Sequence, residues 1–283
     1  MQDASGRVFE CLDREETEFL WEEIFVRRSY VQCGICVPQR GRPLIVDAGA
    51  NIGLFSLFAL SENDQASVIA IEPAPAAFDT LERNLSFYKE ARCLPILLSD
   101  RSEVRRLHFY EGAPGESTCN PRERQMQRRR LLQAMEEQPH RYHHDSSAAA
   151  TVVNVEAQTL TQVLERLPGR QCVDLLKVDV EGDELLVLRG LSTDLWRRVR
   201  QVVVEVHHVH GRLLRVCALL RRHGFRVKAE AQRGGTVEGY CMVVPASLNL
   251  WYVYAVRSRK ARHHTLRVAS TVGAHARTRL SHP

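Results

Sequence analysis

Short apolar runs recur along the chain and alternate with segments in which apolar residues are spaced as on one face of a helix. The runs that predict strands are 44–46, 68–71, 93–98, 107–110, 152–155, 173–182, 201–207, 225–229 and 250–256. The segments that predict helices are 15–25, 52–60, 76–88, 121–138, 160–167, 185–191 and 213–223. Strands that alternate with helices form mostly parallel sheets covered on both faces, so the pattern predicts a doubly wound α/β fold.

Interruptions of this alternation divide the chain into a cover, a main domain and a tail. Residues 1–43 are predicted to form an N-terminal helical cover, and 44–256 the main domain. Within that domain, 111–150 carries a basic helix in place of the βα alternation, which predicts an inserted helical lid; a solvated surface helix is the alternative. Residues 257–283 are basic, contain no acid and have few large apolar side chains, so they are predicted to be a disordered tail.

One stretch, from Leu44 to Ser56, has the pattern of a buried strand, a glycine turn and a helix. Asp47 comes where the strand ends. Gly49 permits backbone angles that other residues avoid and lets a ligand approach the main chain, and Gly53 lets the helix pack closely. Such a turn places free N–H groups and the positive end of a helix at the carboxyl edge of the sheet.

A second acid, Glu72, ends the next predicted strand. An acid about 20 residues after a glycine turn is placed to bind the two hydroxyls of a ribose, which predicts an adenosine-containing cofactor. The pyrophosphate-binding pattern G-x-G-x-x-G is missing, so a cofactor with an amino-acid tail fits better than a dinucleotide. Asp47 is then expected to hold an ammonium group, and Asp100, after the third strand, to face the adenine amino group.

Charge and cysteine content restrict the class of protein. The 283 residues are 44% hydrophobic and 26% charged, which is ordinary for a globular chain. Much of the net charge of +5 lies in the tail, where binding of nucleic acid or of an anionic membrane is less expected than a solvated end. No apolar run is long enough to span a membrane and no secretory signal is visible. The eight scattered cysteines predict reduced thiols and a cytoplasmic location.

The motifs together resemble the FkbM family of S-adenosylmethionine-dependent methyltransferases. The matching stretches are Val46–Phe55, Ile71–Pro73, Leu98–Asp100, Asp174–Gly182 and Val204–His207. Two further stretches, Glu16–Phe25 and Leu219–Phe225, are similar to family members fused into polyketide and nonribosomal peptide synthetases.

The resemblance implies a Rossmann-like class I methyltransferase fold with a seven-stranded sheet. It implies the cofactor S-adenosyl-L-methionine and transfer of its methyl group to a hydroxyl of a small-molecule or carrier-protein-tethered substrate. The loop 47–53, which includes Asn51 and Gly53, and Glu72 are the expected cofactor-binding elements. Within that loop Asp47 and Gly49 are expected to contact the methionine part, while Asp100 is expected near the adenine.

Two other classes of function remain open from the residues alone. The first is a nicotinamide-dependent oxidoreductase, against which the missing G-x-G-x-x-G counts. The second is a basic binding module that has kept the fold and lost catalysis. Acids at several strand ends count against that module, because unused buried carboxylates destabilise a protein.

The catalytic hypothesis concerns the ends of two neighbouring strands. His207 is the candidate general base, Glu181 or Glu205 is expected to orient it, and Asp179 to line the methyl-transfer site. An imidazole has an ordinary pKa of about 6.5, which suits proton removal near neutral pH. The alternatives are His208 or His210 as the base, a structural role for His207, or a metal held by Asp179, Glu181 and His207.

Overall fold

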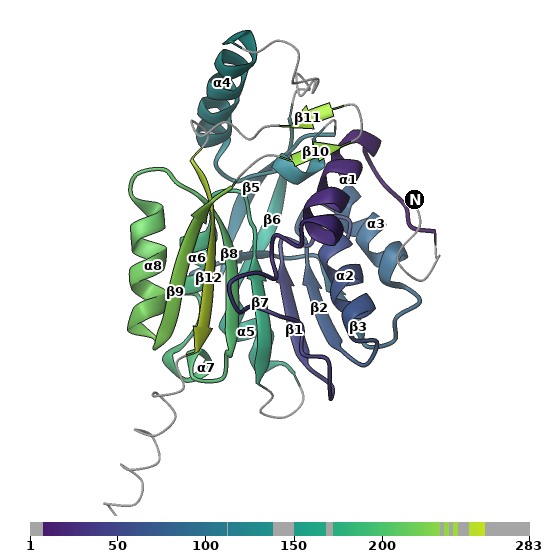
Figure 1. Cartoon of the computed structure of the whole chain (residues 1–283), viewed down its shortest axis with the longest axis vertical. Helices are drawn as coiled ribbons and strands as arrows, with labels where there is room; N and C mark the ends of the chain where they lie inside the picture. The colour runs from purple at the N-terminus through teal and green to yellow at the C-terminus, as the bar shows by residue number, and fades with distance from the viewer. Residues whose placement is uncertain are drawn as a thin grey trace, which may run out of the picture.

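The computed structural model describes residues 8–111, 113–137, 150–167, 172–232, 235–237, 240–242 and 249–257. A seven-stranded sheet lies at its centre, in the order β3-β2-β1-β7-β8-β12-β9 (Figure 1). Its strands are β1 (Leu44–Ala48), β2 (Ser67–Ile71), β3 (Ala91–Leu94), β7 (Val173–Val178), β8 (Gln201–His207), β9 (Phe225–Ala231) and β12 (Leu250–Arg257). Neighbours are parallel except that β12 runs antiparallel to β8 and β9. The predicted doubly wound, mostly parallel sheet is confirmed.

The central strands are buried along their whole length. Every residue of β1, β7 and β8 is buried, because helices cover both faces of the sheet. On one face pack α2 (Leu54–Glu62) and α3 (Pro75–Leu85) with the N-terminal cover. On the other face pack α5 (Leu160–Glu165), α6 (Glu184–Arg189), α7 (Thr193–Trp196) and α8 (Arg212–Arg222). Two apolar cores therefore hold the sheet between them.

The predicted third strand, 93–98, is divided between two sheets. Its first part belongs to β3 of the main sheet, and Leu97–Ser99 forms β4 of a second, three-stranded sheet. Pro95 lies between them and has no N–H to continue the strand ladder. The second sheet has the order β4-β6-β5, with β5 at Glu103–Phe109 and β6 at Thr151–Thr159. The strand predicted at 152–155 thus lies outside the main sheet.

Several segments gather at the carboxyl ends of the parallel strands (Figure 1). The N-terminal cover contributes α1 (Arg14–Trp21), which continues as the π-helix η1 (Glu22–Val26). The insertion between β5 and β6 contributes the short helix η2 (Pro114–Glu116) and α4 (Pro121–Glu137). A small hairpin of β10 (Gly235–Val237) and β11 (Tyr240–Met242) lies nearby. These segments surround the edge where a parallel sheet binds ligands.

Parts of the predicted cover, lid and tail lie outside the described residues. They are 1–7 of the expected cover, 112 and 138–149 of the expected lid, and 258–283 of the expected tail. Among the helices that the structure does describe, none is both long enough and apolar enough to cross a membrane.

Candidate active site

A cavity of about 330 Å³ lies at the carboxyl ends of the parallel strands. Its walls come from the N-terminal cover, the turns after β1 and β2, the ends of β7 and β8, and the insertion. The predicted site residues that line it are Gly49, Asn51, Glu72, Asp179, Glu181, Glu205 and His207. Asp47, Gly53 and Asp100 are not among the lining residues. Most of the predicted site is therefore brought together at one place.

The turn after β1 needs glycine at both predicted positions, for different reasons. Gly49 has φ +78°, and a Cβ atom there would lie 1.6 Å from the carbonyl oxygen of Asp179. The β1 turn therefore lies directly against the end of β7 and forms part of the cavity wall. Gly53 has φ +94°, and its Cβ would lie 2.8 Å from Leu81 of α3. Gly53 thus serves helix packing, against α3 and not against a strand as expected.

Asp47 holds a cation of the protein itself. Its carboxylate is fully buried, accepts a hydrogen bond from Ser56 Oγ at 2.7 Å and lies 3.2 Å from Lys177 Nζ. Lys177 also lies 3.5 Å from Asp179 and donates to the Gly49 carbonyl at 2.6 Å. Burial alone favours a neutral amine, but the two carboxylates outweigh it and raise the pKa of Lys177. Asp47 therefore pairs with Lys177 and does not line the cavity, and its expected contact with a cofactor ammonium stays a prediction.

Glu72 and Asn51 present acceptor oxygens to the cavity. Glu72 accepts backbone N–H groups of Asn51 and Ala74, both at 2.9 Å. Burial raises the pKa of Glu72 to about 7, against the effect of these two hydrogen bonds. The side-chain oxygen of Asn51 is buried and has no hydrogen-bond partner in the described part of the chain. The carboxylate keeps lone pairs for a hydroxyl donor, so the two side chains fit the ribose end of an adenosine-containing cofactor.

Asp100 does not reach the cavity. It follows β4, and its carboxylate lies 3.8 Å from the guanidinium of Arg101. The residues before it, Leu97 and Leu98, line the cavity instead. Asp100 is therefore not part of the cavity lining, and its expected contact with adenine stays a prediction.

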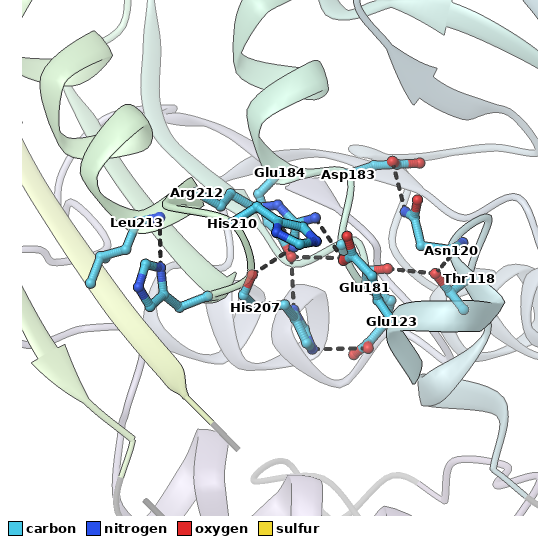
Figure 2. Close-up of polar contacts among 12 residues, drawn as sticks. Thr118, Asn120, Glu123, Glu181, Asp183, Glu184, His207, His210, Arg212 and Leu213 are labelled. Atoms are coloured by element: carbon cyan, nitrogen blue, oxygen red, sulfur yellow. Dashed lines mark hydrogen bonds and ion pairs between the residues drawn. The ribbon is translucent and has the colours of Figure 1, made fainter. Parts of the chain in front are cut away.

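His207 lies between two carboxylates at the end of β8 (Figure 2). Its Nε2 is 3.0 Å from Glu181 and its Nδ1 is 2.7 Å from Glu184. Only an imidazolium donates from both nitrogens. Burial opposes the charge, but the two carboxylates outweigh burial and raise the pKa of His207 well above its ordinary value. These two contacts favour an imidazolium, and a neutral His207 as the general base stays a prediction.

Glu205 has a different partner from the one expected. The hydroxyl of Tyr30, from the N-terminal cover, lies 2.9 Å from Glu205 and 2.9 Å from Asp179. A hydroxyl has one proton to donate, so one of these contacts requires a protonated carboxyl. Burial first and the charge of Asp179 second raise the pKa of Glu205 well above its ordinary value. Glu205 is therefore the protonated member, and the carboxylate that orients His207 together with Glu181 is Glu184.

The start of α4 is docked on the loop that carries these acids (Figure 2). Thr118 Oγ donates to the Glu181 carbonyl at 2.5 Å, and Asn120 donates to Asp183 at 2.9 Å. Arg212 links three elements: it donates to Glu123 of α4 at 2.7 Å and to the His207 carbonyl at 2.6 Å, and it lies 3.5 Å from Glu184. The insertion is thereby fixed to both partners of His207.

The cover and the insertion also meet each other at the cavity. The backbone N–H of Gly115 donates to Glu16 of α1 at 2.7 Å. Burial raises the pKa of Glu16 to about 8, against the effect of this hydrogen bond. Two segments separated by a hundred residues of sequence thus close one side of the cavity.

Comparison with known proteins identifies the family. The model of the methyltransferase FkbM domain matches residues 47–227. The chain belongs to the FkbM methyltransferase family. The 31-O-demethyl-FK506 methyltransferase FkbM of Streptomyces tacrolimicus is 37% identical, over 80% of this chain and 88% of that protein. The methyltransferase sdnD of Sordaria araneosa is 35% identical, over 77% of this chain and 85% of that protein.

A third relative is much longer than this FkbM-family chain. The AMB antimetabolite synthetase AmbE of Pseudomonas aeruginosa is 35% identical, over 85% of this chain and 12% of the synthetase. Membership of the family makes the protein a methyltransferase with the Rossmann-like class I fold, and it implies a methyl donor of the S-adenosylmethionine type. The oxidoreductase and the non-catalytic module are therefore set aside.

Tyr30, Lys177 and Glu184 of this FkbM-family site were not predicted from the sequence. Lys177 is the one basic residue of the buried strand β7, whose other residues are apolar except for Asp174, and a cation in such a strand was a usable signal. Tyr30 and Glu184 carry no such signal, because their roles arise from contacts with distant segments. The rival histidines lie elsewhere: His208 Nδ1 accepts from the Leu213 backbone at 3.2 Å, and neither His208 nor His210 lines the cavity.

Proposed function

We propose that this protein is an S-adenosylmethionine-dependent O-methyltransferase that acts on a hydroxyl of a small-molecule or carrier-tethered acceptor. The observation that carries the proposal is the pair of buried acceptors, Glu72 and Asn51, beside the Gly49 turn of a family methyltransferase. The name of the Streptomyces relative supports oxygen as the methylated atom. The match to part of a synthetase supports a carrier-tethered acceptor.

The cavity has chemically different parts, and each fits a different part of the cofactor. Glu72 would accept the ribose hydroxyls, and the leucines of β4 supply an apolar wall for a base. Asp179, at the end of β7, faces the cavity close to Lys177 and Tyr30 and provides negative charge for a cationic ligand. S-adenosylmethionine, when bound, supplies an electrophilic methyl group on a positively charged sulfur.

Proton removal is assigned to the Glu181–His207 pair and not to a neutral His207. With the imidazole protonated, the two carboxylates and one cation of Glu181, His207 and Glu184 carry a net charge of −1. This negative charge favours the uptake of one proton. Glu181 is the accessible member, with a quarter of its side chain exposed, whereas Glu184 is fully buried. Glu181 would take up the proton of the acceptor hydroxyl, and the cofactor would supply the methyl group to that oxygen. The products would be a methyl ether and S-adenosylhomocysteine.

Calorimetry with S-adenosylmethionine tests the cofactor assignment. Glu72→Gln should weaken binding by about tenfold or more, because it removes a charged acceptor from buried hydroxyl contacts. Glu82→Gln is the matched control, because it makes the same chemical change at an exposed position of α3, the helix that follows Glu72. Equal affinity in both variants and the wild-type protein would contradict the assignment.

Mass spectrometry with a deuterated methyl donor tests the reaction. Hydroxylated acceptors incubated with the protein should gain the labelled methyl group on oxygen, as located by fragmentation. Label found on nitrogen or carbon would leave the methyltransferase standing and refute the O-methyl assignment.

A further inference from the structure

The insertion presents two unsatisfied hydrogen-bond donors to the cavity. Arg124 and Gln127 of α4 line it, and the Arg124 side chain is only 10% exposed. The Nε of Arg124 and the Nε2 of Gln127 are buried and have no hydrogen-bond partner in the part of the chain that the structure describes. Buried donors are normally satisfied, so such a pair in a cavity wall is typical of a ligand contact.

The two donors act from a fixed position. They are three residues apart, which places them on one face of the helix. The start of α4 is held in two places (Figure 2). Asn120 donates to Asp183, in the loop that contains Glu181, and Glu123 accepts from Arg212. The guanidinium of Arg124 is further held 3.4 Å from the centre of the Tyr110 ring. The donors are therefore set at a defined distance from the Glu181–His207 pair.

The charge around Arg124 decides which group they bind. Its Nη2 lies 2.5 Å from Glu116, so the positive charge already has a carboxylate partner. The cavity lining also contains the acid Glu181 and the cations Lys177 and Arg128. A carboxylate or a phosphate at Arg124 would meet Glu116 directly, whereas an uncharged oxygen acceptor there meets the two free donors without that repulsion.

We propose that Arg124 and Gln127 bind a neutral carbonyl oxygen of the methyl acceptor, as in an acyl or keto compound whose hydroxyl is methylated. This inference rests on the proposed O-methyltransferase function and names its substrate class. The donors orient the hydroxyl toward Glu181 and take no part in proton transfer.

Three related alcohols test the proposal: the N-acetylcysteamine thioester of 3-hydroxybutyrate, free 3-hydroxybutyrate, and 1,3-butanediol. We expect the wild-type protein to use the thioester with a kcat/KM about tenfold above that of the diol. The carbonyl oxygen accepts from both donors, whereas the hydroxyl of the diol brings a proton of its own that neither donor can accept. The free carboxylate should be the poorest acceptor. In Gln127→Leu the preference for thioester over diol should fall several-fold, and in Arg124→Met it should fall further.

Matched controls lie on the exposed side of the same helix. Gln125→Leu and Arg129→Met make the same chemical changes at exposed positions, and they should keep the wild-type preference. Equal use of thioester and diol, a preference for the carboxylate, use of none of the three, or an unchanged preference in Gln127→Leu would each overturn the carbonyl assignment. S-adenosylmethionine binding, measured separately by calorimetry, tests the proposed function. A protein that binds the cofactor but shows no preference for the carbonyl compound would refute this inference and leave the proposed function standing.

Discussion

Two buried cations of this protein lie in similar surroundings and behave differently. Lys177 lies between Asp47 and Asp179, and His207 lies between Glu181 and Glu184. They come from adjacent parallel strands, β7 and β8. Each cation has one fully buried partner, Asp47 or Glu184. Each also has one partner that is partly exposed at the cavity, Asp179 or Glu181. The difference lies in the cation itself, because an amine has an ordinary pKa of about 10.4 and an imidazole one of about 6.5.

The comparison separates a structural charge from a reactive one. An amine whose pKa is raised further stays charged throughout the neutral range, so Lys177 holds its partners together and does not give up its proton readily. An imidazole ordinarily titrates near neutral pH, so His207 and its accessible partner Glu181 can share a proton with a ligand while the buried Glu184 fixes the ring. We therefore assign Lys177 to the architecture of the cofactor turn and His207 to the chemistry.

Lys177→Met should have the largest effect, and on stability. It leaves the fully buried Asp47 without its cation, which typically costs about 3–5 kcal/mol of unfolding free energy. Urea denaturation measures this loss, with Lys89→Met at an exposed position as the control. Lys177→Met combined with Asp47→Asn should recover part of the loss. A change below about 1 kcal/mol in the single variant would show that the pair is not structural.

Glu181→Gln should act on turnover instead. It removes the accessible proton acceptor, and loss of a general base lowers turnover by about 10²–10⁴-fold. Affinity for S-adenosylmethionine and the unfolding free energy should stay close to wild type, in contrast to Lys177→Met. If turnover stays within a few-fold of wild type, Glu181 is not the base.

The charge state of His207 is open to direct measurement. Its ¹⁵N imidazole resonances should report an imidazolium at pH 7.5, because the folded pKa is raised. The stabilising contribution of the charged form should be complete below the unfolded pKa of about 6.5 and be lost as pH rises through the raised folded value. Glu184→Gln should move the titration back toward the ordinary pKa. A neutral His207 at pH 7.5 would restore it as the candidate base.

Glu72 provides a third buried charge, held only by backbone N–H groups in the described residues. With its pKa raised to about 7, it is largely protonated below that pH and must ionise to bind hydroxyl donors best. Affinity for S-adenosylmethionine should therefore rise by up to about tenfold per pH unit below 7 and level off above it. Calorimetry in buffers of different ionisation enthalpy should show proton release, and Glu72→Gln should abolish it.

Glu123→Gln should have the smallest effect. It weakens one charged contact between α4 and Arg212 while the other anchors of that helix remain, so we expect a loss of about 1 kcal/mol or less. Hydrogen exchange in the first turn of α4 is the measurement, with Glu111→Gln as the control. Faster exchange spreading to the Glu181 loop would show that docking of the insertion sets the geometry at His207.

The sequence by itself determined the elements and the cofactor end of the site. The apolar runs, Gly49 and Glu72 lie within or directly after strands whose order in a parallel sheet follows from alternation. Their positions at the sheet edge are a consequence of local structure, so motif spacing predicted them. Pro95, also visible in the sequence, was the local signal for the division of the third strand.

The tertiary structure decided the charge states and the acceptor end. Glu184 lies in α6, yet its role comes from contacts with His207 of β8 and Arg212 of α8. Tyr30 reaches Asp179 and Glu205 across more than a hundred residues of sequence. A pKa depends on burial and on charges within a few ångströms, and neither is a property of a motif. The same arrangement, a cation between two carboxylates, therefore serves as a structural ion pair at Lys177 and, in our proposal, as a proton-exchanging site at His207.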